Sequence, residues 1–177
     1  MLPLRDTLRA RRVPVVTWGI VILNVLVFFY ELSLSPAGLE KMIRKYALLP
    51  SALSLQDAST WFPLLSHMFM HGGWVHFLSN MWILVIFGDN VEDRMGRFRY
   101  LMFYLLGGVA AGLVQVMFTA QSNIPSLGAS GAIAAVLGAY ILFYPRARII
   151  SFVPLFILPW IMEILSLIHI SEPTRPY

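Results

Sequence analysis

Long apolar segments with almost no charge constrain the fold of this chain more than any other feature. Residues 100–118 contain no charged side chain, and residues 13–32 contain Asn24 as their only strongly polar member before Glu31. Runs of about 20 apolar residues are long enough to cross the hydrocarbon layer of a bilayer as helices. The two runs therefore predict transmembrane helices.

The composition argues against the alternative that these runs form the core of a water-soluble domain. Hydrophobic residues make up 58% of the chain and charged residues 12%, whereas soluble domains carry about 25% charged residues. So little charge cannot cover a globular surface, and such high hydrophobicity also excludes intrinsic disorder. The chain has no cysteine, which excludes disulfides, thiolate metal sites and a cysteine nucleophile.

Five segments are expected to span the membrane as helices. They are residues 13–32, 74–87 and 100–118, the stretch between Pro125 and Pro145, and residues 149–162, which contain Pro154 and Pro159. A signal peptide is the alternative for the first segment, but the run is long for one and lacks a small-residue cleavage site. Residues 33–63 are too polar to span and are expected to lie at the membrane interface.

The basic residues predict the orientation of the chain. With the N-terminus in the cytoplasm, nine Lys and Arg residues lie inside and four lie outside, which agrees with the bias of cytoplasmic loops. This bias explains the net charge of +4 better than nucleic-acid binding does. We expect residues 1–12 to be a basic cytoplasmic N-terminus and residues 13–164 to be a multi-pass domain in a bacterial cytoplasmic membrane.

Residues 165–177 depart from the pattern of the rest of the chain. They read LSLIHISEPTRPY and resemble translated sequencing adapter, with a short native tail as the alternative. We expect this segment to be a non-native tail, and the membrane domain to be truncated inside its fifth helix.

Polar residues in two predicted spans suggest a hydrolytic site. His76 and Asn80 are four residues apart and project from one helix face, where exposure to lipid would cost several kcal/mol. Ser130 lies among small residues, so helix packing is its alternative role. The three side chains are expected at similar depth below the outer face. A serine hydroxyl beside oxyanion donors fits acyl transfer.

A metal site built from His67, His71 and His76 is a less favourable interpretation. Their spacing of four and five residues is not a usual ligand signature, and no carboxylate lies nearby in the sequence to complete a site. We therefore expect no metal and no cofactor.

These motifs resemble the rhomboid family of intramembrane serine proteases. Residues 128–131 read G-x-S-G, the residues from His71 to Asn80 have H-x4-H-x3-N spacing, and residues 92–96 resemble the family's E-x-R-x-G turn. The resemblance covers residues 13–163 and implies an all-α bundle of six transmembrane helices, about five of them present here. It implies a Ser–His dyad with Ser130 as nucleophile, an oxyanion hole with His76 and Asn80, and motif or structural roles for Gly128, Gly131, His71, Glu92 and Arg94.

The chain departs from the family at the general base. The resemblance implies a base histidine in an A-H-x-x-G motif on the sixth helix, and this motif is absent; the only later histidine, His169, has a different context. We expect the complete gene product to be an endopeptidase that cleaves transmembrane proteins near the outer membrane face. Its partners would be these substrates and the lipid bilayer, with no nucleic acid. We expect negligible proteolysis by the chain as it stands.

Two other functions remain open. An inactive rhomboid-like protein would bind transmembrane segments without cleaving them, although Ser130 within G-x-S-G argues against this function. A small channel or carrier would place polar residues along a pathway through several spans, whereas here they cluster near one face.

Overall fold

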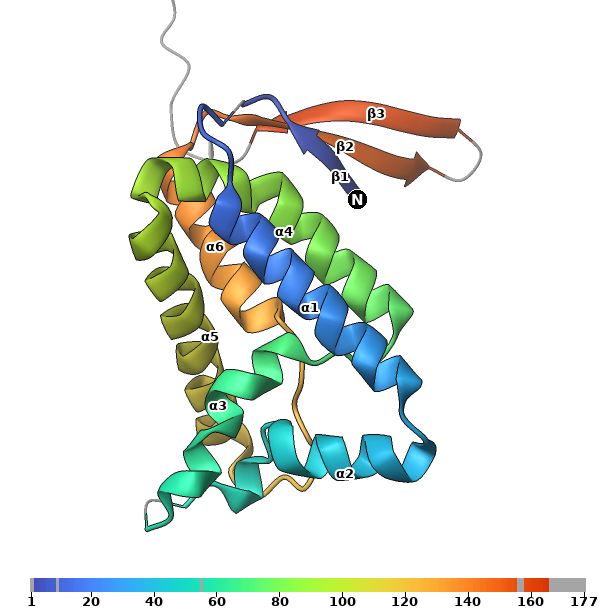
Figure 1. Cartoon of the computed structure of the whole chain (residues 1–177). Helices are drawn as coiled ribbons and strands as arrows, with labels where there is room; N and C mark the ends of the chain where they lie inside the picture. The colour runs from blue at the N-terminus through green and yellow to red at the C-terminus, as the bar shows by residue number, and fades with distance from the viewer. Residues whose placement is uncertain (1, 9, 55, 156–157, 166–177) are drawn as a thin grey trace, which may run out of the picture.

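Helices dominate the computed structural model, which describes residues 2–8, 10–54, 56–155 and 158–165. Within these ranges there are six α-helices, three short 3-10 helices and one three-stranded sheet. Four longer helices run side by side, the sheet lies across one end of them, and α2 and α3 lie toward the other end (Figure 1). The structure is therefore mostly helical.

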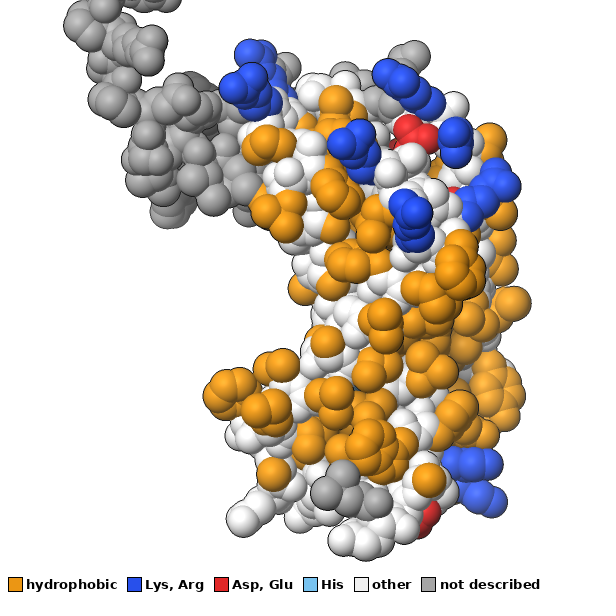
Figure 2. Space-filling model, turned by 90° about the vertical axis from the view of Figure 1, so that its left-hand side faces the viewer, with side chains coloured by type: hydrophobic (Ala, Val, Ile, Leu, Met, Phe, Trp, Pro, Cys, Tyr) orange, Lys and Arg blue, Asp and Glu red, His pale blue; other side chains and the backbone are white. Residues whose placement is uncertain are grey.

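The four longer helices are α1 (Val15–Ser33), α4 (Trp74–Met95), α5 (Arg97–Thr119) and α6 (Ser130–Phe143). Helices α1 and α5 are long and apolar enough to cross a membrane, and α6 is apolar but shorter. Large apolar side chains on these helices are exposed, including Leu106 (67%), Phe118 (84%) and Leu142 (80%). A broad hydrophobic region covers the middle of one face, with Lys and Arg toward its two ends (Figure 2). Such a surface suits contact with lipid.

The segment between α1 and α4 folds into short elements at one end of the bundle. It contains α2 (Pro36–Tyr46), η1 (Pro50–Ala52), η2 (Ala58–Trp61), α3 (Pro63–Ser66) and η3 (His67–Phe69). Ser35 begins α2 because its hydroxyl accepts the Gly38 N–H at 3.3 Å, and Pro36 occupies the first turn, where a missing N–H costs nothing. Helix α2 lies across the end of α1 (Figure 1).

Helix α4 extends to Met95, so the predicted end at Phe87 was wrong. The polar residues that suggested an end have partners within the fold, because Asn90 and Glu92 are buried and hydrogen-bonded. The helix ends instead at Gly96, whose φ of +82° favours glycine. The E-x-R-x-G motif therefore covers the last turn of α4 rather than a turn after it.

Helix α6 begins at Ser130, later than the proline-bracketed span predicted. The residues before it are extended: Leu48 and Ser126 form a bridge between chain segments. The Gly128 N–H donates to the His67 carbonyl at 2.9 Å. Figure 1 shows this extended segment rising from the α2 end of the bundle, so that α6 starts part-way along α5.

The predicted fifth helix at residues 149–162 is wrong in this structure, and so is an entirely α-helical fold. The segment forms β2 (Arg148–Leu155) and β3 (Leu158–Leu165), which pair antiparallel in the order β1-β2-β3 with β1 (Leu2–Asp6). Pro154 lies opposite Pro159 in the pairing of β2 with β3. Proline lacks the N–H that a helix interior needs, and β-branched residues such as Ile149 and Ile150 favour strands.

Small residues bring α5 and α6 into close contact. A Cβ atom placed on Gly131 would lie 2.5 Å from the Ala111 Cβ, and one on Gly107 would lie 2.6 Å from the Ala135 Cβ. Gly131 and Ala135 of α6 therefore pack closely against α5. The core lies between the four long helices, and its largest fully buried side chains include Tyr100, Tyr104, Tyr140 and Phe28.

Candidate active site

Ser130 is the first residue of α6, and its side chain is exposed. The first N–H groups of a helix have no partner within the helix, and the helix dipole favours negative charge at this end. A hydroxyl at this position is therefore accessible and lies beside backbone groups that can stabilise an anion. The extended segment before α6 sets the start of this helix away from the end of α5 (Figure 1).

His76 packs against the chain two residues before Ser130. A Cβ atom placed on Gly128 would lie 2.5 Å from Cε1 and 2.6 Å from Nε2 of the His76 ring. Only glycine leaves room for this contact, and its φ of +127° is one that other residues rarely adopt. The glycine of the G-x-S-G motif thus permits the imidazole of α4 to lie directly against the segment that carries the serine.

Asn80 lies one helical turn beyond His76 on α4 and is buried, with 7% of its surface exposed. Its Nδ2 group has no hydrogen-bond partner among the described residues. Leaving a buried donor unpaired costs about 1–3 kcal/mol, so most buried polar groups are hydrogen-bonded. The Asn80 amide is available to a ligand or a reaction intermediate.

The His71 ring packs against the His76 ring, and the described hydrogen bonds of His71 to Glu31 are made by its backbone N–H. The ring centroids of the two histidines are 5.3 Å apart, and neither ring nitrogen of His71 has a partner among the described residues. The His71 N–H donates to the buried Glu31 carboxylate on α1, at 3.2 and 3.3 Å. Burial, followed by the nearby His76, lowers the pKa of His71 to about 4, so its imidazole is neutral near pH 7.

The His67 ring contacts the backbone of its own segment, whereas the rings of His71 and His76 pack against each other. Its Nδ1 lies 2.8 Å from the Pro63 carbonyl, and burial lowers its pKa. No group of three or more His, Asp and Glu side chains among the described residues is placed to hold a metal ion.

Glu92 and Arg94 lie in the last turn of α4, at the opposite end of this helix from His76. The Glu92 carboxylate accepts the Val16 N–H at 3.0 Å and the Thr17 N–H at 2.8 Å, and it also accepts the Thr17 hydroxyl at 2.8 Å. These are first-turn groups of α1, so Glu92 caps that helix from another helix. Arg94 is exposed in the last turn of α4.

The structure thus brings His76 to the segment of Gly128 and Ser130, with Asn80 and His71 on either side of His76 along the chain. Sequence reasoning missed Glu31, which was treated only as a polar residue near the end of an apolar run. An acid inside a predicted span is itself a signal, because such a group needs a partner. His169 and the rest of the predicted tail after Leu165 lie outside the described residues.

Similarity to known proteins covers most of the chain. Residues 58–173 match the rhomboid domain. The chain is 33% identical over 141 residues to the human presenilin-associated rhomboid-like protein, mitochondrial, covering 78% of this chain and 35% of that protein. It is 37% identical over 89 residues to the Danio rerio presenilin-associated rhomboid-like protein A, mitochondrial (49% and 23%). It is 40% identical over 73 residues to Arabidopsis thaliana rhomboid-like protein 11, chloroplastic (41% and 26%). The chain therefore spans about a third or less of the length of these curated relatives.

Proposed function

The chain belongs to the rhomboid family, and from this premise we propose that it is the core of an intramembrane serine endopeptidase with Ser130 as nucleophile. Proteases of this family are intramembrane serine proteases. The observation that carries the proposal is the His76 ring packed against Gly128, two residues before an exposed serine at the start of α6. The substrates would be transmembrane proteins.

In the proposed reaction, the Ser130 hydroxyl attacks the carbonyl carbon of the scissile peptide bond. A base takes the hydroxyl proton, the new C–O bond forms, and the carbonyl electron pair moves onto oxygen to give the tetrahedral oxyanion. Collapse of this intermediate expels the amine with a proton, and water then releases the acyl group from Ser130.

The oxyanion needs donors that are in place before the charge develops. The unpartnered Asn80 Nδ2 and the His76 ring would supply them, together with a backbone N–H at the start of α6. The glycine at position 128 supports this assignment, because any side chain there would push the His76 ring away. Gly131 would support the site by letting α6 approach Ala111 of α5. His71 would support it by holding the segment before α4 against Glu31 of α1.

The general base has no counterpart in the A-H-x-x-G form among the described residues. We propose that a histidine outside them provides it in the complete gene product, and that the 177-residue chain has negligible activity. We further propose that the N-terminus is cytoplasmic, which places the α2 end of the bundle and the cleavage site toward the outer face.

The test compares the product of the whole gene with the present chain, each in proteoliposomes with a single-span reporter protein. We expect cleavage by the whole product, loss of cleavage in Ser130→Ala, and retention in the control Ser126→Ala, which removes a nearby serine of the same segment. Cleavage that persists in Ser130→Ala would overturn the nucleophile assignment. Ser130-dependent cleavage by the 177-residue chain would show that no further base is needed.

The second candidate is an inactive protein that binds transmembrane segments, and the missing A-H-x-x-G motif favours it only if the C-terminus of the chain is native. If the whole gene product binds the reporter but leaves it intact under all conditions, this candidate replaces the protease.

A further inference from the structure

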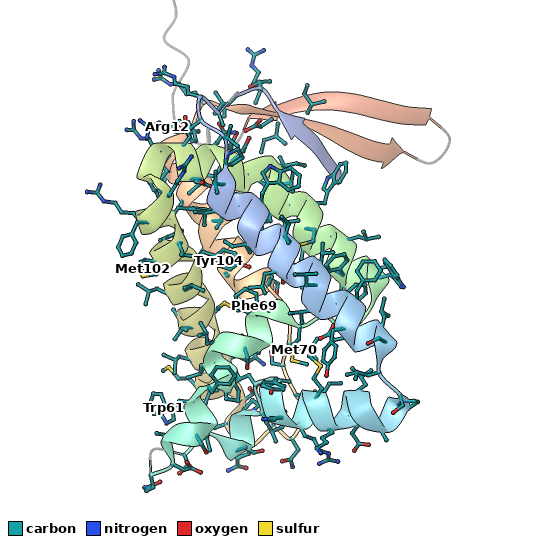
Figure 3. All side chains as sticks on the ribbon, in the orientation of Figure 1. Arg12, Trp61, Phe69, Met70, Met102 and Tyr104 are labelled. Carbon is teal, nitrogen blue, oxygen red and sulfur yellow. The ribbon has the colours of Figure 1, made fainter. Side chains whose placement is uncertain are left out.

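An apolar cavity of about 620 Å³ lies between α1, α2 and the α3–η3 segment. This volume is in the range of small-molecule sites, about 300–1,000 Å³. Helix α1 lines the cavity with Leu23 and Val27, and the η3 region lines it with Phe69 and Met70. Figure 3 shows Phe69 and Met70 where these elements meet. The cavity is separate from the candidate active site, because neither Ser130, His76 nor Asn80 lines it.

Two positive charges stand on the α2 side of this apolar cavity. Lys41 and Lys45 are one helical turn apart and both line it. Neither has an ion-pair partner among the described residues, and the Lys45 Nζ lies over the Tyr46 ring, 5.0 Å from its centroid. Their aliphatic stems can cover apolar surface while the ammonium groups reach polar surroundings.

The charged residues of α2 lie on two faces of the helix, with an ion pair on one face and the two lysines on the other. Arg44 pairs with Glu40 at 2.7 Å, and this pair lines a different pocket beside Asn123 and Pro125. Acid and base are therefore neutralised on one face, whereas the face toward the cavity keeps two unneutralised lysines. An occupant that complements this surface has an apolar body and an anionic group at one end.

We propose that this cavity binds an anionic phospholipid, with its acyl chain against Leu23, Val27 and Phe69 and its phosphate beside Lys41 and Lys45. The position fits such a ligand, because α1 is a membrane-capable span and α2 lies across its end with an amphipathic sequence. Basic residues near a membrane surface favour anionic headgroups. The bound lipid would join α2 to α1 at the edge of the bilayer.

The test measures lipid binding to the delipidated, purified 177-residue chain in detergent by native mass spectrometry. Dioleoylphosphatidylglycerol is titrated in parallel with dioleoylphosphatidylcholine, which has the same chains and no net charge. We expect one phosphatidylglycerol site that is at least tenfold tighter than any phosphatidylcholine site. The double variant Lys41→Gln/Lys45→Gln should weaken phosphatidylglycerol binding about 25-fold, since each lysine near an anionic lipid contributes about 1 kcal/mol.

The matched control is Arg97→Gln/Arg99→Gln, which removes two exposed charges at the opposite end of the bundle and should leave the site unchanged. Val27→Trp fills the cavity without touching the lysines and should also abolish the site, with circular dichroism to verify folding. Equal binding of both lipids, or unchanged binding in either cavity variant, would overturn the proposal. Displacement of phosphatidylglycerol by an uncharged transmembrane peptide would assign the cavity to a polypeptide and overturn it as well. None of these outcomes bears on the protease proposal, because proteolysis is not measured.

Discussion

Two regions of this molecule differ in the hydrogen bonding of their buried polar side chains. At the sheet end (Asp6, Thr17, Asn90, Glu92 and Tyr140), they are hydrogen-bonded: Glu92 caps α1, and Asp6 accepts the Asn90 amide at 2.8 Å and the Tyr140 hydroxyl at 2.9 Å. In the site region (Glu31, His71, His76, Asn80 and Ser130), both ring nitrogens of His71 and the Asn80 Nδ2 lack partners among the described residues.

Burial does not explain this difference. Asn90 and Glu92 are 3% exposed, and His71 and Asn80 are 6% and 7% exposed. An unpaired buried group costs about 1–3 kcal/mol, so the unpaired groups of the site region lower the free energy of unfolding. Among the described residues, unpaired atoms also occur on Asn24, Tyr100 and Tyr104, and the Tyr100 hydroxyl lies beside Thr17 at the sheet end. An unpaired atom alone therefore does not identify a site. The proximity of His76 to the serine segment distinguishes the site region.

The largest effect is expected from Glu92→Ala at the sheet end. The change removes three hydrogen bonds to a carboxylate and leaves two first-turn N–H groups of α1 unpaired, so the free energy of unfolding should fall by about 3 kcal/mol. Denaturation by sodium dodecyl sulfate in mixed micelles, followed by circular dichroism, measures it. The control is Asp93→Ala, whose carboxylate accepts one exposed N–H, from Arg11, at 3.1 Å. Equal losses in the two variants would contradict the capping role.

A matched pair of asparagines on α4 tests the comparison directly. Asn90→Leu should lower the free energy of unfolding by about 2 kcal/mol, because it removes the donor to Asp6. Asn80→Leu should leave stability unchanged or slightly higher, because its Nδ2 has no partner among the described residues to lose. In the whole gene product, Asn80→Leu should lower the rate of cleavage about 100-fold, as expected for loss of an oxyanion donor.

The asparagine comparison would fail if Asn80→Leu destabilised the chain as much as Asn90→Leu does. Such a result would mean that Asn80 is a structural residue. Full cleavage by a stably folded Asn80→Leu variant would remove Asn80 from the proposed oxyanion hole.

The smallest effect is a pH dependence that arises from His71. Folding lowers its pKa from 6.5 to about 4, through burial first and the charge of His76 second. Near pH 7 and above, the imidazole is mostly neutral in both states. As the pH falls below 6.5, the unfolded chain gains a proton that the folded chain does not accept until about pH 4. The free energy of unfolding should therefore fall by about 1 kcal/mol between pH 7 and pH 5.5 from this group.

His71→Phe should reduce this slope, because a phenyl ring fits beside Phe28 and Phe77 and does not titrate. The slope that remains belongs in part to His67, whose pKa burial also lowers. Unfolding titrations at four pH values between 5.5 and 7.5 measure both slopes. An unchanged slope in the variant would show that the His71 ring is not kept neutral by burial.

The sequence was sufficient where the physical signal was local. Hydropathy alone predicted α1 and α5, because a long uncharged run can satisfy its backbone in lipid only as a helix or in a closed barrel. The H-x4-H-x3-N and G-x-S-G motifs predicted a site, and the structure places His76 beside Gly128. The catalytic roles of these residues remain predictions.

The errors occurred where partners distant in sequence decide the structure. The polar residues after Phe87 suggested the end of a helix, but Glu92 finds its partners 75 and 76 residues away, at the start of α1. The start of α6 depends on a bridge from Ser126 to Leu48 and on the contact from Gly128 to His67. The hairpin of β2 and β3 pairs with β1 from the other end of the chain. No local pattern carries this information.

The sequence by itself determined that this protein faces lipid, which segments are apolar enough to span, and which polar side chains lie within those segments. These properties follow from composition, periodicity and chemical identity. The tertiary structure alone decided which buried polar groups are paired and which remain free. It separated Glu92, which caps a helix, from Asn80, whose Nδ2 has no partner in the part of the chain that the structure describes, because pairing depends on which side chains the fold brings within hydrogen-bond distance. It also revealed the apolar cavity with two lysines, since three chain segments form its walls.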